Sequence, residues 1–153
     1  MVNILQNIFP ASFLKKFNIT APKAEQEIYL ATLALFLEMA YIDSEFSTEE
    51  TQRISQIFTM EYGLDKDYLE QLTRLAEQEL KDSHDLWKFT NLINRNLNHS
   101  EKIRIVELIW KIIYADGKLD SYEDYLIHKL ARLLNLAHSD LINAKLKVLH
   151  DES

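Results

Sequence analysis

The sequence predicts an all-α fold: a single multihelical domain in which a pseudo-twofold duplication relates two three-helix repeats around two central helices. Apolar residues recur with a period of about 3.6 along most of the chain, which is typical of helices with one buried face. The 153 residues include only two glycines and two prolines, too few for a turn-rich β fold. A motif that occurs twice predicts the duplication. With 47% apolar residues, a chain of this length can bury one sizeable core.

The motif defines two acidic corners between helices. Both copies read Tyr-x-Asp-x-x-apolar-x-x-x-Glu, at residues 41–50 and again 73 positions later at residues 114–123. Each copy follows one apolar helical pattern and precedes another, so the equivalence extends to the flanking helices. It predicts repeats over about 21–81 and 99–150, joined by a linking helix over 83–96.

The N-terminal segment, residues 1–20, precedes the helical domain that we predict over 21–150. It carries eight Ile, Leu and Phe side chains, and Pro10 divides them into two short pieces. Amphipathic segments of this kind usually cover a core, so the pattern favours a strap lying over the domain. The alternative is an exposed arm that binds a partner.

The first repeat begins with a helix over about 22–41. Apolar residues occupy most of its circumference, which predicts a central, buried helix. Ser47 and Glu50 form a capping box for the next helix, because the hydroxyl and the carboxylate can satisfy two free backbone amides. Gly63 is predicted to end that helix in a left-handed conformation, and Asp65 opens the third helix.

Both tryptophans fall on apolar helical stripes. Trp87 lies on the stripe of the linking helix and Trp110 on that of the second central helix, and both are predicted to be core residues. The second central helix is predicted to run from Glu101 to about Ala115, with Ser100 as its N-terminal cap.

The second repeat continues in the same order as the first. Asp120 and Glu123 form a box-like cap for the next helix. Asn135 takes the place of Gly63 at an offset of 72, so the second repeat is one residue shorter at this point. The last helix, over about 139–149, is predicted to bury an apolar face made of Leu141, Ile142, Leu146 and Leu149.

The charge is unevenly distributed along the chain. The net charge is −7, and residues 1–82 hold 14 acidic against 7 basic residues, whereas residues 83–153 hold 10 of each. An acidic surface repels phosphate backbones and anionic lipid, so we expect no binding to nucleic acid or to membrane surfaces. The same surface favours cations or a basic partner.

The composition also limits the cellular compartment and the kinds of catalytic and metal site that we expect. The chain has no cysteine, which excludes disulfides, thiol catalysis and cysteine-based metal sites, and which suits the cytoplasm. No apolar run reaches the roughly 18–20 residues that a membrane span needs. The N-terminus lacks the basic region and the cleavage site of a signal peptide. We therefore expect a cytoplasmic protein.

The two motif copies and the apolar helices before them resemble the TerB-like family of tellurite-resistance and co-chaperone N-terminal domains, over about residues 25–148. The resemblance implies an all-helical, duplicated fold and a role in bacterial stress response. It also implies a metal site at the acidic motif positions, which here are Asp43, Glu50, Asp116 and Glu123. Ser47 and Asp120 rank behind them as ligands. The first copy departs from the family pattern, because Ser44 stands where the second copy has Gly117.

An EF-hand does not explain these corners. Counting from Asp116 as position 1, the bidentate acid of position 12 is replaced by Ile127, and counting from Asp43 it is replaced by Ile54. Ca²⁺ or Mg²⁺ binding in another geometry remains open, because two related corners could together supply four carboxylates. The alternative is that the same residues only cap helices and satisfy turn amides.

Three functional classes follow from the sequence. The first is a non-enzymatic module that binds a divalent cation, Ca²⁺ or Mg²⁺, in a stress-response system similar to tellurite resistance. The second is a metal-free scaffold whose acidic first repeat holds a protein partner, which the sequence does not name. The third, a hydrolase using paired carboxylates, ranks last, because no nucleophile motif or glycine-rich phosphate loop accompanies them.

Overall fold

The computed structural model describes residues 23–40, 48–82, 86–116 and 121–151, without the side chains of residues 23–25, 48–51 and 116. The predicted strap at residues 1–20 lies outside this part. The described residues form seven α-helices and one 3₁₀ turn and contain no strand, which confirms the all-α prediction. The elements are α3 (Lys23–Ala40), α4 (Thr48–Tyr62), α5 (Lys66–Asp82), α6 (Trp87–Asn96), α7 (His99–Ile113), η2 (Tyr114–Asp116), α8 (Ser121–Leu133) and α9 (His138–Asp151).

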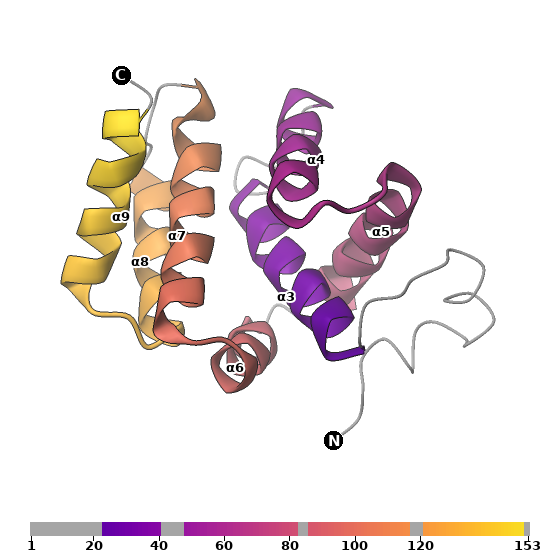
Figure 1. The fold of residues 1–153 in the computed structure, drawn as a ribbon, viewed down its shortest axis with the longest axis horizontal. Helices are drawn as coiled ribbons and strands as arrows, with labels where there is room; N and C mark the ends of the chain where they lie inside the picture. The colour runs from indigo at the N-terminus through magenta and orange to yellow at the C-terminus, as the bar shows by residue number, and fades with distance from the viewer. Residues whose placement is uncertain (1–22, 41–47, 83–85, 117–120, 152–153) are drawn as a thin grey trace.

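Two helices, α3 and α7, pack against each other at the centre of the molecule (Figure 1). Every residue from 30 to 37 of α3 is at most 1% exposed, and every residue from 105 to 110 of α7 is at most 6% exposed. The apolar side chains of each helix cover almost its whole circumference. Both helices are therefore stable only where other helices pack on them from several sides. The prediction of two central helices is therefore confirmed.

The other helices repeat the same packing around each centre. α3 packs against α4 and α5, and α7 packs against α8 and α9. Each repeat also contacts the central helix of the other repeat: α4 packs against α7, and α8 packs against α3. The central helices end at equivalent residues, Ala40 and Ile113, and α4 and α8 begin at equivalent residues, Thr48 and Ser121. Both pairs have the offset of 73, so the structure carries the duplication predicted from the motif.

Helix α6 is the exception to this symmetry. It packs against α3 and also against α8, where the side-chain Nδ2 of Asn94 donates a hydrogen bond to the carbonyl of Leu133 at 2.8 Å. No described helix takes the equivalent place against α7 and α4. Figure 1 shows α6 below the two central helices, where it joins one repeat to the other.

Two residues with positive φ end equivalent helices. Gly63, at φ 65°, follows α4, and Asn135, at φ 59°, follows α8, as the sequence predicted. At this turn the amide of Leu136 donates a hydrogen bond to the carbonyl of Ala131 at 2.9 Å. The amide of Asn135 donates one to the carbonyl of Arg132 at 3.0 Å. This pair of bonds is a Schellman motif, in which a left-handed residue lets the chain leave the helix.

Four sequence predictions about individual side chains are wrong. The cap of α7 is Asn98, two residues before the predicted Ser100: its side chain accepts from the amide of Glu101, whose carboxylate accepts from the amide of Asn98. Trp87, Leu146 and Leu149 were expected in the core but are 57%, 57% and 39% exposed. Apolar spacing shows that residues share a helix face, but it does not show that another element covers that face.

None of the helices in the described part of the chain combines the length and the apolar character needed to cross a bilayer.

Candidate functional site

The acidic corners lie only partly within the described residues. Three of the six candidate ligands lie outside them: Asp43, Ser47 and Asp120. Glu50 stands in the first turn of α4 and Asp116 is the last residue of η2, but their side chains are not described. Glu123 lies in the first turn of α8, and its side chain is half-buried.

The helices that lead into the two corners have a common orientation. α3 and α7 pack against each other and run in the same direction, from the lower to the upper part of Figure 1. The 3₁₀ turn η2, which follows α7, and the first turn of α4 both lie toward the upper end of the molecule. The pseudo-twofold arrangement therefore directs the elements that flank the two corners toward one end. The distances among the four carboxylates lie outside the described part.

The described side chains by themselves form no metal centre. Among them, no group of three or more His, Asp or Glu residues is placed to hold a metal ion. The capping box that the structure does describe is the one at α7, with its two hydrogen bonds at 2.9 and 3.0 Å. Glu101 of this box is a reference for what a glutamate does when it only caps a helix.

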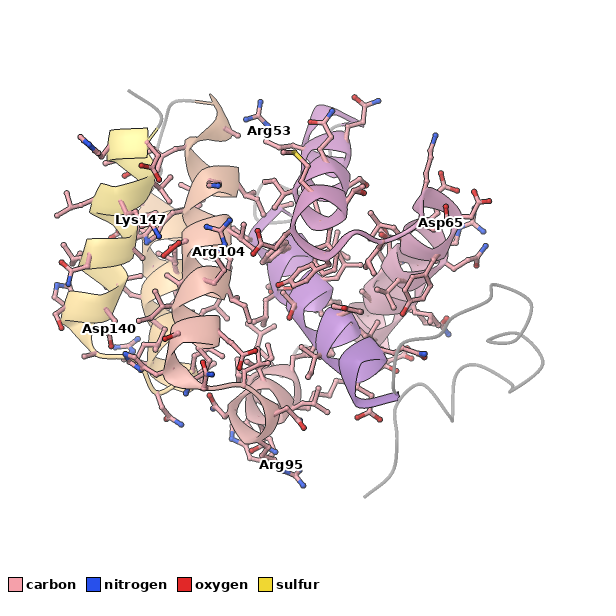
Figure 2. All side chains as sticks on the ribbon, viewed as in Figure 1. Arg53, Asp65, Arg95, Arg104, Asp140 and Lys147 are labelled. Carbon is pink, nitrogen blue, oxygen red and sulfur yellow. The ribbon has the colours of Figure 1, made fainter. Side chains whose placement is uncertain are left out.

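A second polar feature connects three helices on the side of the molecule facing the viewer in Figure 2. Arg104 of α7 donates two hydrogen bonds to Glu61 of α4, from Nε to Oε1 at 2.8 Å and from Nη2 to Oε2 at 2.7 Å. Its Nη1 also donates to Oε2 of Glu107, one turn further along α7, at 3.1 Å. The other oxygen of Glu107 accepts from Nζ of Lys147 on α9 at 3.3 Å.

Burial decides which of these charges matters most for the fold. The side chain of Glu107 is 7% exposed, whereas those of Glu61 and Arg104 are 23% and 39% exposed. A buried carboxylate is costly unless cations and donors surround it, so Arg104 and Lys147 make this position of α7 tolerable. The bidentate geometry with Glu61 ties the first repeat to the second.

The same contacts shift the pKa values of the groups involved. The hydrogen bonds from Arg104 hold the pKa of Glu61 below its usual value, and they outweigh the opposing effect of partial burial. The hydrogen bond with Glu61 likewise raises the pKa of Arg104. Beside this pair, burial raises the pKa of Tyr62 above its usual value.

Sequence reasoning missed this network. Glu61 and Arg104 are 43 residues apart, and no short motif joins them. A signal was present in α7 itself, where the charged residues Arg104 and Glu107 stand at i and i+3 within a strongly apolar helix. Charges at such positions are stable only with partners on neighbouring elements.

One comparison with known proteins decides the family. The family model described as tellurite resistance protein TerB matches residues 29–146, well over half of the chain. The chain belongs to the TerB family. No curated protein and no solved structure matches it.

The TerB region contains both acidic corners. It spans both central helices from residue 29, together with Glu61, Arg104 and Glu107, while residues 1–20 lie before it. The resemblance seen in the sequence is thereby confirmed at the level of the family.

Proposed function

We propose that this TerB-family chain is a non-enzymatic module that binds one divalent cation, Ca²⁺ or Mg²⁺, between its two acidic corners. Its ligands would be Asp43, Glu50, Asp116 and Glu123, with Ser47 and Asp120 as secondary candidates. Hard cations of this kind require several oxygen ligands, and two related corners offer four carboxylates. Membership of the TerB family supports a role for such a module in a tellurite-resistance-like stress response.

The common direction of α3 and α7 is the observation that best supports this proposal. Because the two central helices pack together and point the same way, two described elements that flank the corners, η2 and the first turn of α4, lie toward the same end of the molecule. Corners at opposite ends could not share an ion. A net charge of −7, concentrated in the first half, adds an attraction for cations.

Thermal unfolding of chelator-treated protein, with and without Ca²⁺ or Mg²⁺, tests the proposal. A ligand at 100 times its dissociation constant stabilises the native state by about 2.7 kcal/mol, and wild type should show a shift of that order. Glu123→Gln should abolish most of the shift, because a hard cation needs the carboxylate charge.

Glu101→Gln is the matched control, because Glu101 occupies the third helical position of a capping box away from both corners. A glutamine can still cap a helix, so this variant should keep the full cation response. If wild type and Glu123→Gln melt identically with and without cation, the metal-free scaffold becomes the better reading of the corners.

A further inference from the structure

The outer face of α8 carries four exposed side chains in a row, which we name the α8 stripe. Tyr122, Tyr125, Lys129 and Arg132 follow one another at spacings of three, four and three residues, so they lie within about 80° of arc on the helix surface. The two tyrosines are 57% and 56% exposed, and both basic residues are exposed as well. Helices α3, α6, α7 and α9 pack against α8, and the residues that it buries lie on its other side. The stripe is therefore open to solvent.

The two halves of the stripe differ in chemistry. In the N-terminal half the rings of Tyr122 and Tyr125 contact each other, with centroids 6.2 Å apart. In the C-terminal half Lys129 and Arg132 form no ion pair with any described residue. One half thus offers aromatic rings and the other offers two cations. A cation near the face of an aromatic ring is attracted by the ring quadrupole, so the two halves attract each other.

The stripe can pair with a copy of itself in one register. Tyr122 and Arg132 each stand five residues from Ile127, and Tyr125 and Lys129 each stand two residues from it. In an antiparallel pair of α8 helices whose two-fold axis passes at the level of Ile127, Tyr122 therefore lies opposite Arg132 of the second copy, and Tyr125 lies opposite Lys129. A two-fold contact uses the same patch on both copies and must be self-complementary. The α8 stripe meets this requirement with all four of its residues.

The remaining charges of α8 favour the same pairing. Its two acidic residues, Glu123 and Asp124, lie in the first turn, beside the tyrosines. An antiparallel pair brings this turn near the basic end of the second copy, so the acids attract Lys129 and Arg132. A parallel pair would place acids beside acids and bases beside bases. The one further ionisable ring of α8 is His128, whose Nδ1 lies 3.6 Å from Oδ1 of Asp124.

The position of α8 keeps the acidic parts of two copies apart. The excess of acidic residues lies in residues 1–82, whereas residues 83–153 hold equal numbers of acids and bases. Figure 1 shows α4 and α5 of the first repeat on the far side of α3 from α8 and α9. A contact through α8 therefore joins the balanced halves. The chain also uses the same attraction internally, because Nζ of Lys145 lies 5.4 Å from the ring centroid of Trp110.

We propose that the α8 stripe binds the α8 stripe of a second copy of this chain, in an antiparallel and two-fold symmetric pair. A single helix of 13 residues on each side makes a smaller contact than the roughly 1,200 Å² that stable complexes bury, so the dimer is weak and reversible. The pairing needs no cation, and it is measured in the presence of chelator. Its outcome is therefore separate from that of the proposed cation site.

Sedimentation velocity of the full chain over a concentration series measures the pairing. Wild type should pass from monomer to dimer with a dissociation constant in the micromolar range. Lys129→Glu combined with Arg132→Glu should raise this constant at least about ten-fold, because the dimer loses four cation–π contacts. Wild type that remains monomeric at millimolar concentration would overturn the proposal.

A charge-matched control makes the test specific to the stripe. Lys66→Glu combined with Arg74→Glu changes the net charge by the same amount at two exposed positions of α5. This variant should dimerise like wild type. If it weakens the dimer as strongly as the α8 variant does, general repulsion between acidic copies explains the loss and the proposal fails.

A complementary pair of variants tests the antiparallel register. Tyr122→Arg combined with Tyr125→Lys should not form a homodimer, because cations would face cations. Mixed with Lys129→Glu combined with Arg132→Glu, it should form a heterodimer. In that heterodimer one half of the contact keeps its rings and cations, and the other half gains pairs of carboxylates and cations. An equimolar mixture that contains only monomers would contradict this register and, with it, the proposal.

Tyr122→Ser combined with Tyr125→Ser tests whether another segment of the same chain covers the stripe. At a concentration where wild type is monomeric, its melting temperature should equal that of wild type, because exposed side chains contribute little to stability. Its dissociation constant for the dimer should rise at least about ten-fold. A lower melting temperature with unchanged dimerisation would mean that a segment of the same chain packs on the tyrosines, which is incompatible with the proposal.

Discussion

Helices α4 and α8 hold equivalent places in the two repeats, yet only α8 packs against a further helix of the described part. Helix α6 contacts the C-terminal end of α8, where Asn94 donates a hydrogen bond to the carbonyl of Leu133. Helix α4 has no such additional neighbour among the described elements, and Met60 near its C-terminal end is 87% exposed. Within the described residues, one linking helix thus packs on one half of a duplicated scaffold.

The central helices show the same contrast. Ala31 and Ala34 of α3 are at most 1% exposed, whereas their equivalents on α7 are Arg104 and Glu107. Small residues allow neighbouring helices to pack closely around α3. On α7 an ion network reaches to α4 and α9 instead. Equivalent positions of the two central helices are thus filled in different ways, by small packed residues on α3 and by an ion network on α7.

The largest expected effect comes from placing a charged residue of α7 at the equivalent buried position of α3. Ala31→Arg introduces arginine, the residue type of Arg104, at a position of α3 that is 1% exposed. The buried, unpaired guanidinium should lower the free energy of unfolding by more than about 4 kcal/mol. Urea denaturation measures the loss. A change within about 1 kcal/mol would show that α3 is not covered on this side.

Equivalent core positions should respond alike. Phe36 and Ile109 correspond under the offset of 73 and are both 0% exposed. Phe36→Ala should cost about 3–5 kcal/mol and Ile109→Ala about 2–5 kcal/mol, because each leaves a cavity in a close-packed centre. Met60→Ala, at an 87% exposed position of α4, should change stability by no more than about 0.5 kcal/mol. A surface-like response at either core position would contradict the pairing of α3 with α7 at the centre.

The smallest effect concerns the ion pair between the repeats, and it depends on pH. Glu61 has a lowered pKa in the folded chain, so its contribution is present above the usual value of 4.5 and is lost as pH falls through the folded pKa. Glu61→Gln should therefore cost about 1 kcal/mol at pH 7, and this loss should shrink as pH falls below 4.5. Glu70→Gln, at an exposed position of α5, is the control and should match wild type over the same pH range. A loss for Glu61→Gln that stays constant as pH falls below 4.5 would show that packing, rather than charge, is responsible.

Most of the fold could be predicted from the sequence because its signals are local or repeated. Helical periodicity located the helices, and the duplicated motif paired α3 with α7. The positive φ of Gly63 and of Asn135 followed from their places after equivalent helices. Each of these inferences uses residues close together in the chain, or two copies of the same pattern.

The remaining features depend on contacts between distant segments. Trp87 lies on an apolar stripe, but the packing that leaves it 57% exposed is a property of the assembled helices. The bond from Arg104 to Glu61 joins residues 43 positions apart, so no spacing rule predicts it. The acidic corners remain a prediction at the level of their side chains, because Asp43 lies outside the described residues and the side chains of Glu50 and Asp116 are not described.

The number of ions bound per chain tests the central claim, that the two halves join at one end to form one site. Isothermal titration calorimetry of chelator-treated protein should give one Ca²⁺ or Mg²⁺ per chain. Glu50→Gln in the first corner and Glu123→Gln in the second should each remove that same binding event, whereas Glu101→Gln should keep it. Two ions per chain, with each corner variant removing one, would contradict a shared site, and so would the absence of any binding by wild type.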